Sequence, residues 1–349
     1  MTTQASPAPA VTVAVLGTGR LAHALTTALA ARGVPVTMLS ARSPERTRAL
    51  DADLTVLAVS DDAIGPVADA LATDAAARAA GHGSTAGHEA GDEHEAGDEQ
   101  GPATGHGVVH CSGALDLTPL APLAADHRLG AWHPMQAFAT VDTPIAPGVT
   151  WGITADPGLR DVLAELTTTL GGRPVLLRPE DRARYHAAAT MASNYTVVLV
   201  DHAARLLQDC GLDARSALDA LLPLVRSTLD GLQDVGLPAG LTGPAVRGDV
   251  GTIRRHLAAL AARPDTAALY RAVGLAAHDL LVARGMDPAT LAAIDAAFRD
   301  PDAPARHDHG DPTPPAHGDP TPPDHGDAAP PAHGDAALRD CADHPGSST

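Results

Sequence analysis

The chain has 349 residues, of which 44% are hydrophobic and 2% aromatic, so it is long enough for two domains with aliphatic cores. Its formal net charge is −18, and most of this charge lies in residues 79–107, with six acidic residues and no Arg, and in residues 300–349, with ten Asp and two Arg. The absence of a basic patch argues against a nucleic-acid partner, and no apolar run approaches the ~20 residues needed to cross a membrane.

Other compositional features point to a cytoplasmic protein. The N-terminal stretch MTTQASPAPA has neither the basic nor the apolar region of a secretory signal. The three cysteines, Cys111, Cys210 and Cys341, are far apart and form neither a disulfide framework nor a metal motif, so we expect no metal site in the fold. All 24 basic residues are Arg, which excludes any mechanism that needs a catalytic lysine.

Strands and helices alternate in the first half of the chain. A helix is expected up to Ala31 and another from about residue 61 to Ala80, while the tandem repeat HEAGDE within 79–107 predicts a disordered insert. The alternation indicates a parallel sheet covered by helices. The expected strands are 11–16, 34–39, 54–59, 108–110, 128–132, 149–153 and 173–177.

The second half is rich in Ala and Leu at helical spacing. Helices are expected at 181–210, 214–234, 250–262, 265–284 and 287–298. The tail at 300–349 repeats His-Gly-Asp every eight residues among prolines, a composition that cannot pack a core. The predicted fold is therefore α/β: a disordered segment 1–10, a Rossmann-type parallel-sheet domain 11–178, an all-α domain 179–299 and the tail.

A dinucleotide fingerprint, Gly17-x-Gly19-x-x-Ala22, lies between the first strand and the first helix. In this context Gly17 allows the tight turn, Gly19 lets the backbone approach a pyrophosphate and Ala22 lets the helix pack closely. The free N–H groups of the helix N-terminus favour the phosphates. The residues expected to bind the cofactor are Gly17, Thr18, Gly19, Arg20, Leu21, Ser40, Arg42, Val59, Ser60 and Asp61.

The end of the second strand indicates which dinucleotide is bound. An NAD site has an acidic residue here, whereas this chain has Ser40-Ala-Arg42-Ser43. Because Arg42 can pair with a 2′-phosphate, the sequence predicts NADP(H). Asp61 follows another strand at the same edge, and the alternative is that it caps the next helix.

Two histidines follow strands at the edge where ligands bind. His110-Cys-Ser112-Gly113 is expected to present hydrogen-bond donors to a substrate, unless His110 is a buried structural residue. His133 precedes a proline, and we expect Trp132 and Phe138 to give its imidazole apolar walls and a pKa near neutrality, suited to proton transfer. The alternative is a structural loop histidine.

The first long helix carries His186, Thr190 and Asn194 at intervals of four, so they share one face. With Tyr185 and Tyr195 on the same helix, five of the seven aromatic residues would lie near the site, which favours a cleft over a solvated face. The other members of the five are Trp132, Phe138 and Trp151. Farther on, Arg247 is a candidate for binding a substrate carboxylate, and Asp249 for capping a helix.

In chain order, the motifs GTGRLA, AVSDDAI, HCSGAL, GAWHPMQAF, YHAAATMASNY and LTGPAVRGD resemble the Rossmann-like oxidoreductases with a C-terminal DUF2520 domain. These are related to pyrroline-5-carboxylate reductases and 6-phosphogluconate dehydrogenases. The resemblance covers 11–298 except 79–107. It implies an NADP-linked homodimer that binds a small oxo acid or imine, and some members resemble alternative ketopantoate reductases of pantothenate biosynthesis.

One departure from the related enzymes concerns the proton donor. Ketopantoate reductases and 3-hydroxyacid dehydrogenases have a lysine four residues before an asparagine, whereas Thr190 precedes Asn194 here. The resemblance therefore leaves His133, His110 or His186 as the donor. We expect reduction of a small 2-oxo acid, with Ser112, Gly113 and Asn194 orienting it. The alternatives are an imine reductase, which needs no strong acid, and a non-catalytic dinucleotide sensor.

Overall fold

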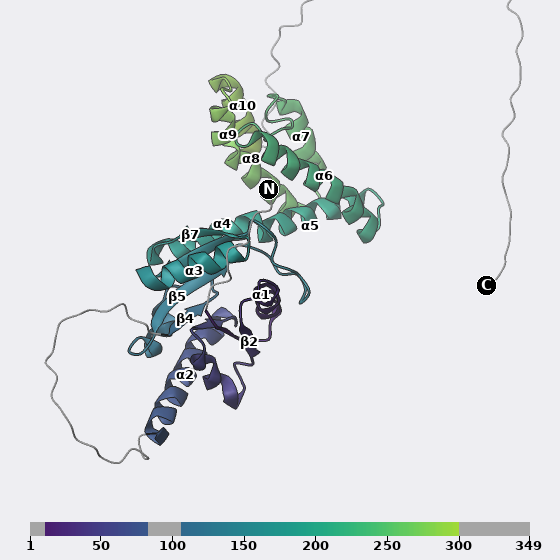
Figure 1. Ribbon diagram of the computed structural model, residues 1–349. Coiled ribbons are helices and arrows are strands. Elements are labelled where there is room, and N and C mark those ends of the chain that lie inside the picture. Colours follow the sequence, from purple (N-terminus) through teal and green to yellow (C-terminus); the bar gives the residue numbers. More distant parts are fainter. Residues whose placement is uncertain (1–10, 83–105, 300–349) are drawn as a thin grey trace, which may run out of the picture. The chain divides into compact units, whose positions relative to one another are not determined.

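The computed structural model describes residues 11–82 and 106–299, except for the side chains of 81 and 82 (Figure 1). The chain forms two compact units, one ending at Gly240 and the other beginning at Leu241. The helices between residues 182 and 235 therefore belong to the same unit as the sheet, although the domain boundary predicted from the sequence lies at 178/179. Within the described ranges, no helix is both long and apolar enough to span a bilayer.

The first unit is built on a seven-stranded sheet in the order β2-β1-β3-β4-β5-β6-β7. Strands β1 to β5 are parallel, β6 runs antiparallel to β5, and β7 runs parallel to β6. The sheet is thus mostly rather than wholly parallel, because residues 135–149 form no helix that could carry the chain across to a parallel neighbour. The strands are β1 (Val13–Leu16), β2 (Val36–Leu39), β3 (Leu54–Leu57), β4 (Gly107–His110), β5 (Arg128–Pro134), β6 (Thr150–Ala155) and β7 (Arg173–Leu176).

Helices cover both faces of this sheet. Alternate residues of β1 point to opposite sides: Val13 and Val15 pack with α1 (Arg20–Ala31) and α3 (Pro157–Thr169), while Ala14 and Leu16 pack with α2 (Asp61–His82). Three short 3₁₀ helices, η1 (Pro44–Asp51), η2 (Thr118–Leu123) and η3 (Pro179–Asp181), lie in the connections.

Helix α3 was not expected from the sequence. Its start signal is nevertheless present, because the Asp156 side chain accepts a hydrogen bond from the backbone N–H of Leu159, and Pro157 occupies the first turn. A capping residue followed by proline would have been enough to predict it.

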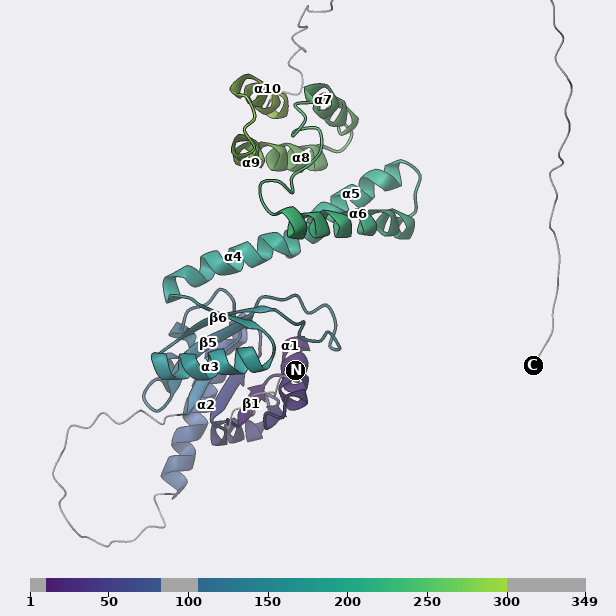
Figure 2. The same ribbon diagram turned by 45° about the horizontal axis from the view of Figure 1, so that its top comes forward.

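Two of the expected helices are interrupted. The stretch 181–210 forms α4 (Arg182–Ala192) and α5 (Asn194–Asp209), which separate at Ser193, and 265–284 forms α8 (Pro264–Ala276) and α9 (His278–Ala283). Helix α6 (Ala214–Val235) packs beside α5 (Figure 2). In the second unit, α7 (Val250–Ala259), α8, α9 and α10 (Pro288–Arg299) enclose a separate core that includes Ile253 and Phe298.

Several predictions concern residues outside the described ranges. These are the disordered segment 1–10, most of the insert 79–107, and the tail 300–349 with its His-Gly-Asp repeat. At the edges of the insert, residues 79–82 belong to α2 and Gly107 begins β4.

Candidate active site

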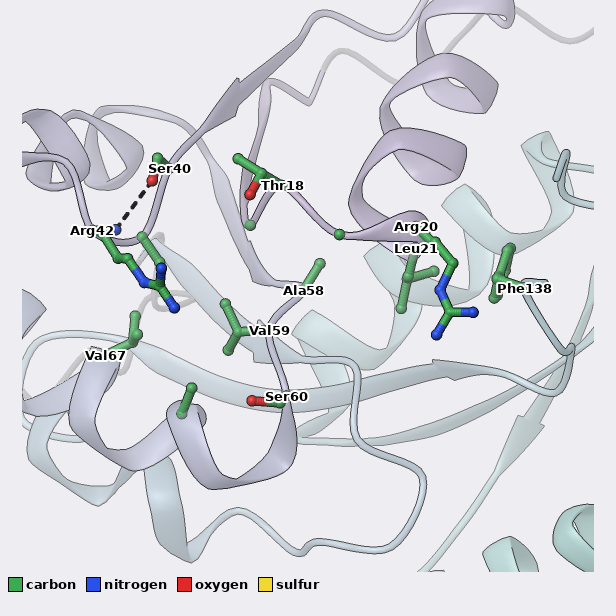
Figure 3. A pocket seen from close by; sticks show the side chains of 14 residues that line it. Thr18, Arg20, Leu21, Ser40, Arg42, Ala58, Val59, Ser60, Val67 and Phe138 are labelled. Carbon is green, nitrogen blue, oxygen red and sulfur yellow. Dashed lines mark hydrogen bonds between the residues drawn. The ribbon is translucent and has the colours of Figure 1, made fainter. Parts of the chain in front are cut away.

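A cavity of about 640 Å³ lies at the carboxyl ends of β1, β2 and β3 (Figure 3). Every residue expected to bind the cofactor lines it except Asp61. The glycine-rich turn after β1 and the start of α1 form one side, and Ala58 to Ser60, after β3, form another. This is the crevice in which open α/β sheets bind their ligands.

The two fingerprint glycines have different physical roles. Gly17 has φ +147°, and a Cβ there would lie 2.2 Å from the carbonyl oxygen of Ala58, so this position tolerates no side chain. A Cβ on Gly19 would meet no protein atom within 4 Å, which leaves open space at the N-terminus of α1. Ala22 is fully buried and lies next to Gly17, so it allows the close packing expected of it.

Two arginines mark opposite ends of this cavity (Figure 3). Arg42 lies at the end of β2, where its backbone N–H donates to Ser40 Oγ over 3.3 Å. Arg20 lies beside Phe138, and its Nη1 donates to the carbonyl of Ala139 over 3.2 Å. No acidic residue is found among the described residues that line the cavity, so its charge is suited to an anionic ligand.

A second cavity, of about 560 Å³, adjoins the first, since Arg20 and Phe138 line both. The predicted residues His133, His186, Thr190 and Asn194 all line it. His186, Thr190 and Asn194 were expected to share one helix face. They line the same cavity, even though Ser193 separates α4 from α5.

Two imidazoles meet at Gly113 beside this second cavity. The ring centroids of His133 and His186 are 5.7 Å apart, and the rings are nearly perpendicular. A Cβ on Gly113 would lie 2.9 Å from Nε2 of His133 and 2.4 Å from Cδ2 of His186. Gly113 thus leaves the room that both rings need, so its role is steric.

His133 is not poised near neutrality as expected. Burial, followed by the nearby His186 and Arg182, lowers the pKa of His133 to about 4. Its imidazole is therefore uncharged at neutral pH. It can hold or accept a hydrogen bond there, but it is a weak candidate for a cationic acid.

This shift predicts a pH-dependent stability. In the unfolded chain His133 titrates near 6.5, so between that pH and about 4 the unfolded state binds more protons and the free energy of unfolding falls with decreasing pH. Burial also lowers the pKa of His106 to about 4, which adds to the same window. In urea unfolding at a series of pH values, the free energy of unfolding of His133→Asn and of His106→Asn should each fall less steeply with decreasing pH than that of wild type. A slope identical to wild type in both would contradict these shifts.

His110, Ser112 and Asp61 are bound to other protein groups rather than free to contact a ligand. In His110, Nε2 lies 2.8 Å from the Asp116 carbonyl and Nδ1 accepts from the Ser112 N–H over 3.2 Å, while burial lowers its pKa. Ser112 Oγ donates to Asp61 Oδ2 over 2.9 Å and accepts from the N–H of Leu115 over 3.1 Å. These contacts fix the loop after β4 against the start of α2.

The expected wall of aromatic residues around His133 is only partly present. Trp132 is buried in the core, stacked on Trp151 at 4.4 Å, with its Nε1 donating to Thr167 Oγ1 over 2.8 Å. Adjacent strand residues point to opposite faces, so Trp132 cannot flank the His133 side chain. Tyr195 is 56% exposed, which leaves Phe138 and Tyr185 as the aromatic residues near the site.

Arg182, at the start of α4, was not among the residues predicted from the sequence. It is fully buried: Nε donates to the Leu115 carbonyl over 2.5 Å, Nη1 donates to Thr154 Oγ1 over 3.1 Å, and a further nitrogen donates to the Ser112 carbonyl. Arg182 thereby attaches α4 to the loop that carries Gly113. The signal in the sequence was its spacing of four residues from His186, which puts both on one helix face.

The last candidate, Arg247, lies in the second unit, in the turn that precedes α7. The turn is closed by the Arg247 N–H donating to the Pro244 carbonyl over 3.2 Å. Asp249 caps α7, as expected, by accepting from the Thr252 N–H over 2.9 Å.

Comparison with known proteins agrees with this geometry. Residues 12–79 match the family model "NADP oxidoreductase coenzyme F420-dependent", and residues 149–277 match the domain of unknown function DUF2520. The chain is a Rossmann-like, NADP-dependent oxidoreductase. No curated protein matches it.

Solved structures share the fold of this oxidoreductase. BF3122 from Bacteroides fragilis, described as an NADP oxidoreductase, is 21% identical with a TM-score of 0.54, over 75% of this chain and 96% of that one. Protein TM1727 from Thermotoga maritima is 18% identical with a TM-score of 0.51, over 82% and 100%.

The residues of the first cavity fit NADP(H). Gly17 and Gly19 leave the helix N-terminus open to a pyrophosphate, and Arg42 stands where an NAD enzyme would have an acidic residue. We therefore expect the first cavity to hold the cofactor, with the second cavity beside it.

Proposed function

We propose that this oxidoreductase uses NADPH to reduce a small imino acid, a compound with a C=N bond and a carboxylate. The supporting observation is the second cavity, which adjoins the proposed cofactor crevice at Arg20 and Phe138. In our proposal the 2′-phosphate binds Arg42 and the nicotinamide lies beside Phe138, so that bound NADPH supplies a hydride to a substrate in the second cavity.

The protonation of His133 favours an imine. Carbonyl reduction needs a group that gives a proton to oxygen, and the chain has no lysine. The pKa of His133 is lowered to about 4, so its imidazole is neutral at the pH where such a proton would be needed. A protonated imine brings its own proton and can donate a hydrogen bond to a neutral imidazole. The sequence favoured a 2-oxo acid first, and the lowered pKa of His133 leads us to put the imino acid first instead.

Substrate binding would use the other polar residues of the second cavity. Arg20 is the one Arg among the described residues that line it, which favours a substrate with a carboxylate. Asn194 offers both a donor and an acceptor from α5 and would orient the reacting group. Alignment of this kind supplies much of the rate of a hydride transfer.

A 2-oxo acid is the second candidate, because His186 also lines this cavity. Its imidazole could donate the proton to a carbonyl oxygen in place of His133. Ketopantoate belongs to this candidate. A homodimer, a cytoplasmic location and a part in pantothenate biosynthesis stay predictions from the family resemblance.

The proposal is tested by the rate of NADPH oxidation by the purified full-length protein. Substrates are pyrroline-5-carboxylate as a cyclic imino acid, 2-ketopantoate as an oxo acid, and coenzyme F420, which the family description of residues 12–79 mentions. We expect the fastest turnover with the imino acid. If only F420 supports NADPH oxidation, the substrate is F420 and not an imino acid. NADPH binding without turnover on any of the three would favour the non-catalytic sensor.

The proposed roles of His133 and Asn194 predict specific losses. His133→Asn should lower kcat about 100-fold and Asn194→Ala at least about tenfold, both with unchanged affinity for NADPH. Tyr195→Phe is the matched control: Tyr195 adjoins Asn194 in sequence but is exposed and absent from the described lining of the cavity. If His133→Asn and Asn194→Ala both keep a kcat within tenfold of wild type, the proposed roles of His133 and Asn194 are wrong.

A further inference from the structure

The phenol of Tyr185 lies against His133 at a position where the sheet leaves room for it. His133 in β5 pairs with Gly152 in β6. A Cβ on Gly152 would lie 2.8 Å from Cζ of Tyr185, so the phenol occupies the space above this glycine. The rings of Tyr185 and His133 meet edge to face, with their centroids 5.6 Å apart. Tyr185 is thus held by the sheet on one side and by α4 on the other.

Two polar contacts join these residues. Tyr185 Oη lies 3.1 Å from His133 Nδ1 and 3.3 Å from the His133 carbonyl oxygen. Burial raises the pKa of Tyr185, so the phenol keeps its hydrogen. A carbonyl oxygen can only accept, so the contact with it requires Oη–H as the donor. The phenol has no second hydrogen, and the contact with Nδ1 is then a hydrogen bond only if Nδ1–H donates to Oη.

A neutral imidazole carries one hydrogen, so a hydrogen on Nδ1 leaves Nε2 with a free lone pair. Nε2 lies against Gly113 and next to His186, and both histidines line the second cavity. Among the residues that the structure describes, the hydrogen bond of the His133 ring is made at Nδ1, so the lone pair of Nε2 is left for a ligand.

We propose that Tyr185 is a positioning residue that holds His133 in the Nδ1–H tautomer, so that Nε2 accepts a hydrogen bond from the substrate. This deepens the proposed function and rests on it for the identity of the substrate. The tautomer selects compounds that present an N–H or O–H donor at the reacting atom, which a protonated imine does and a ketone oxygen does not. Without the phenol, the imidazole is free to place its hydrogen on Nε2 and repel that donor.

Long-range proton–nitrogen NMR spectra of ¹⁵N-labelled full-length protein at neutral pH test the tautomer directly, because protonated and unprotonated ring nitrogens differ in chemical shift. The His133 signals are those lost in His133→Asn. We expect Nδ1–H in wild type, and a shift toward Nε2–H in Tyr185→Phe, which keeps the aromatic ring. Nε2–H in wild type, or an unchanged tautomer in a folded Tyr185→Phe, overturns the proposal. If Tyr185→Phe does not fold, the wild-type spectrum alone decides.

Tyr270→Phe is the matched control, because Tyr270 Oη makes the same kind of contact with His256 Nδ1, at 2.8 Å. It should leave the His133 signals unchanged. With the imino acid as substrate, Tyr185→Phe should also lower kcat about tenfold without changing KM for NADPH, whereas Tyr270→Phe should not. The NMR result needs no substrate. An absence of turnover therefore counts against the proposed function, while the wrong tautomer counts against Tyr185.

Discussion

Gly17→Ala is expected to disable cofactor binding and to destabilise the sheet unit. The new Cβ would lie 2.2 Å from the Ala58 carbonyl oxygen, on a residue whose φ is +147°. Strain and overlap together should lower the free energy of unfolding by about 3 kcal/mol or more. Because the turn after β1 would have to move, the affinity for NADPH should fall at least about 100-fold. Urea unfolding and fluorescence titration with NADPH measure the two effects.

Gly19→Ala provides the contrast. Its Cβ would meet no protein atom within 4 Å, so the free energy of unfolding should change by less than about 1 kcal/mol. A bound pyrophosphate would nevertheless meet the methyl group, and NADPH affinity should still fall. If Gly19→Ala binds NADPH as tightly as wild type, the pyrophosphate does not lie at this turn.

Arg42→Ala is expected to remove the preference for NADPH over NADH. A hydrogen-bonded charge pair with the 2′-phosphate contributes ~1.5–3 kcal/mol, so the Kd for NADPH should rise about 10- to 100-fold while the Kd for NADH stays constant. Calorimetric titration with both dinucleotides measures this.

Arg48→Ala is the control for Arg42→Ala. Arg48 lies on η1, its side chain is 67% exposed, and it pairs with Glu45 at 3.4 Å rather than lining the cavity. Its loss should affect neither affinity. If Arg42→Ala raises the Kd for NADPH and the Kd for NADH by the same factor, Arg42 does not contact the 2′-phosphate.

The cofactor crevice could be predicted from the sequence because its determinants are local. Gly17, Gly19 and Ala22 lie within six residues where the first strand passes into the first helix, and Arg42 lies three residues after the next strand. Parallel strands bring their carboxyl ends to one edge, so residues that follow separate strands could be assigned to one site. Nine of the fourteen residues that line the first cavity were assigned to it in this way.

The hydrogen bonding within the site could not be predicted in the same way. Ser112 with Asp61 and Tyr185 with His133 are contacts between residues more than fifty positions apart, and local patterns do not specify which polar atoms find protein partners. The proximity of Trp132 to His133 in sequence was misleading. The alternation of side chains along a strand, applied to this pair, would have sent the indole to the core and the imidazole to the site.

The most direct test of the proposed cofactor site is a crystal structure of the full-length protein with bound NADP⁺. We expect the 2′-phosphate at Arg42, the pyrophosphate at Gly19 and the nicotinamide beside Phe138, facing the second cavity and His133. A 2′-phosphate without contact to Arg42, or a nicotinamide that does not reach the second cavity, would contradict the proposed site.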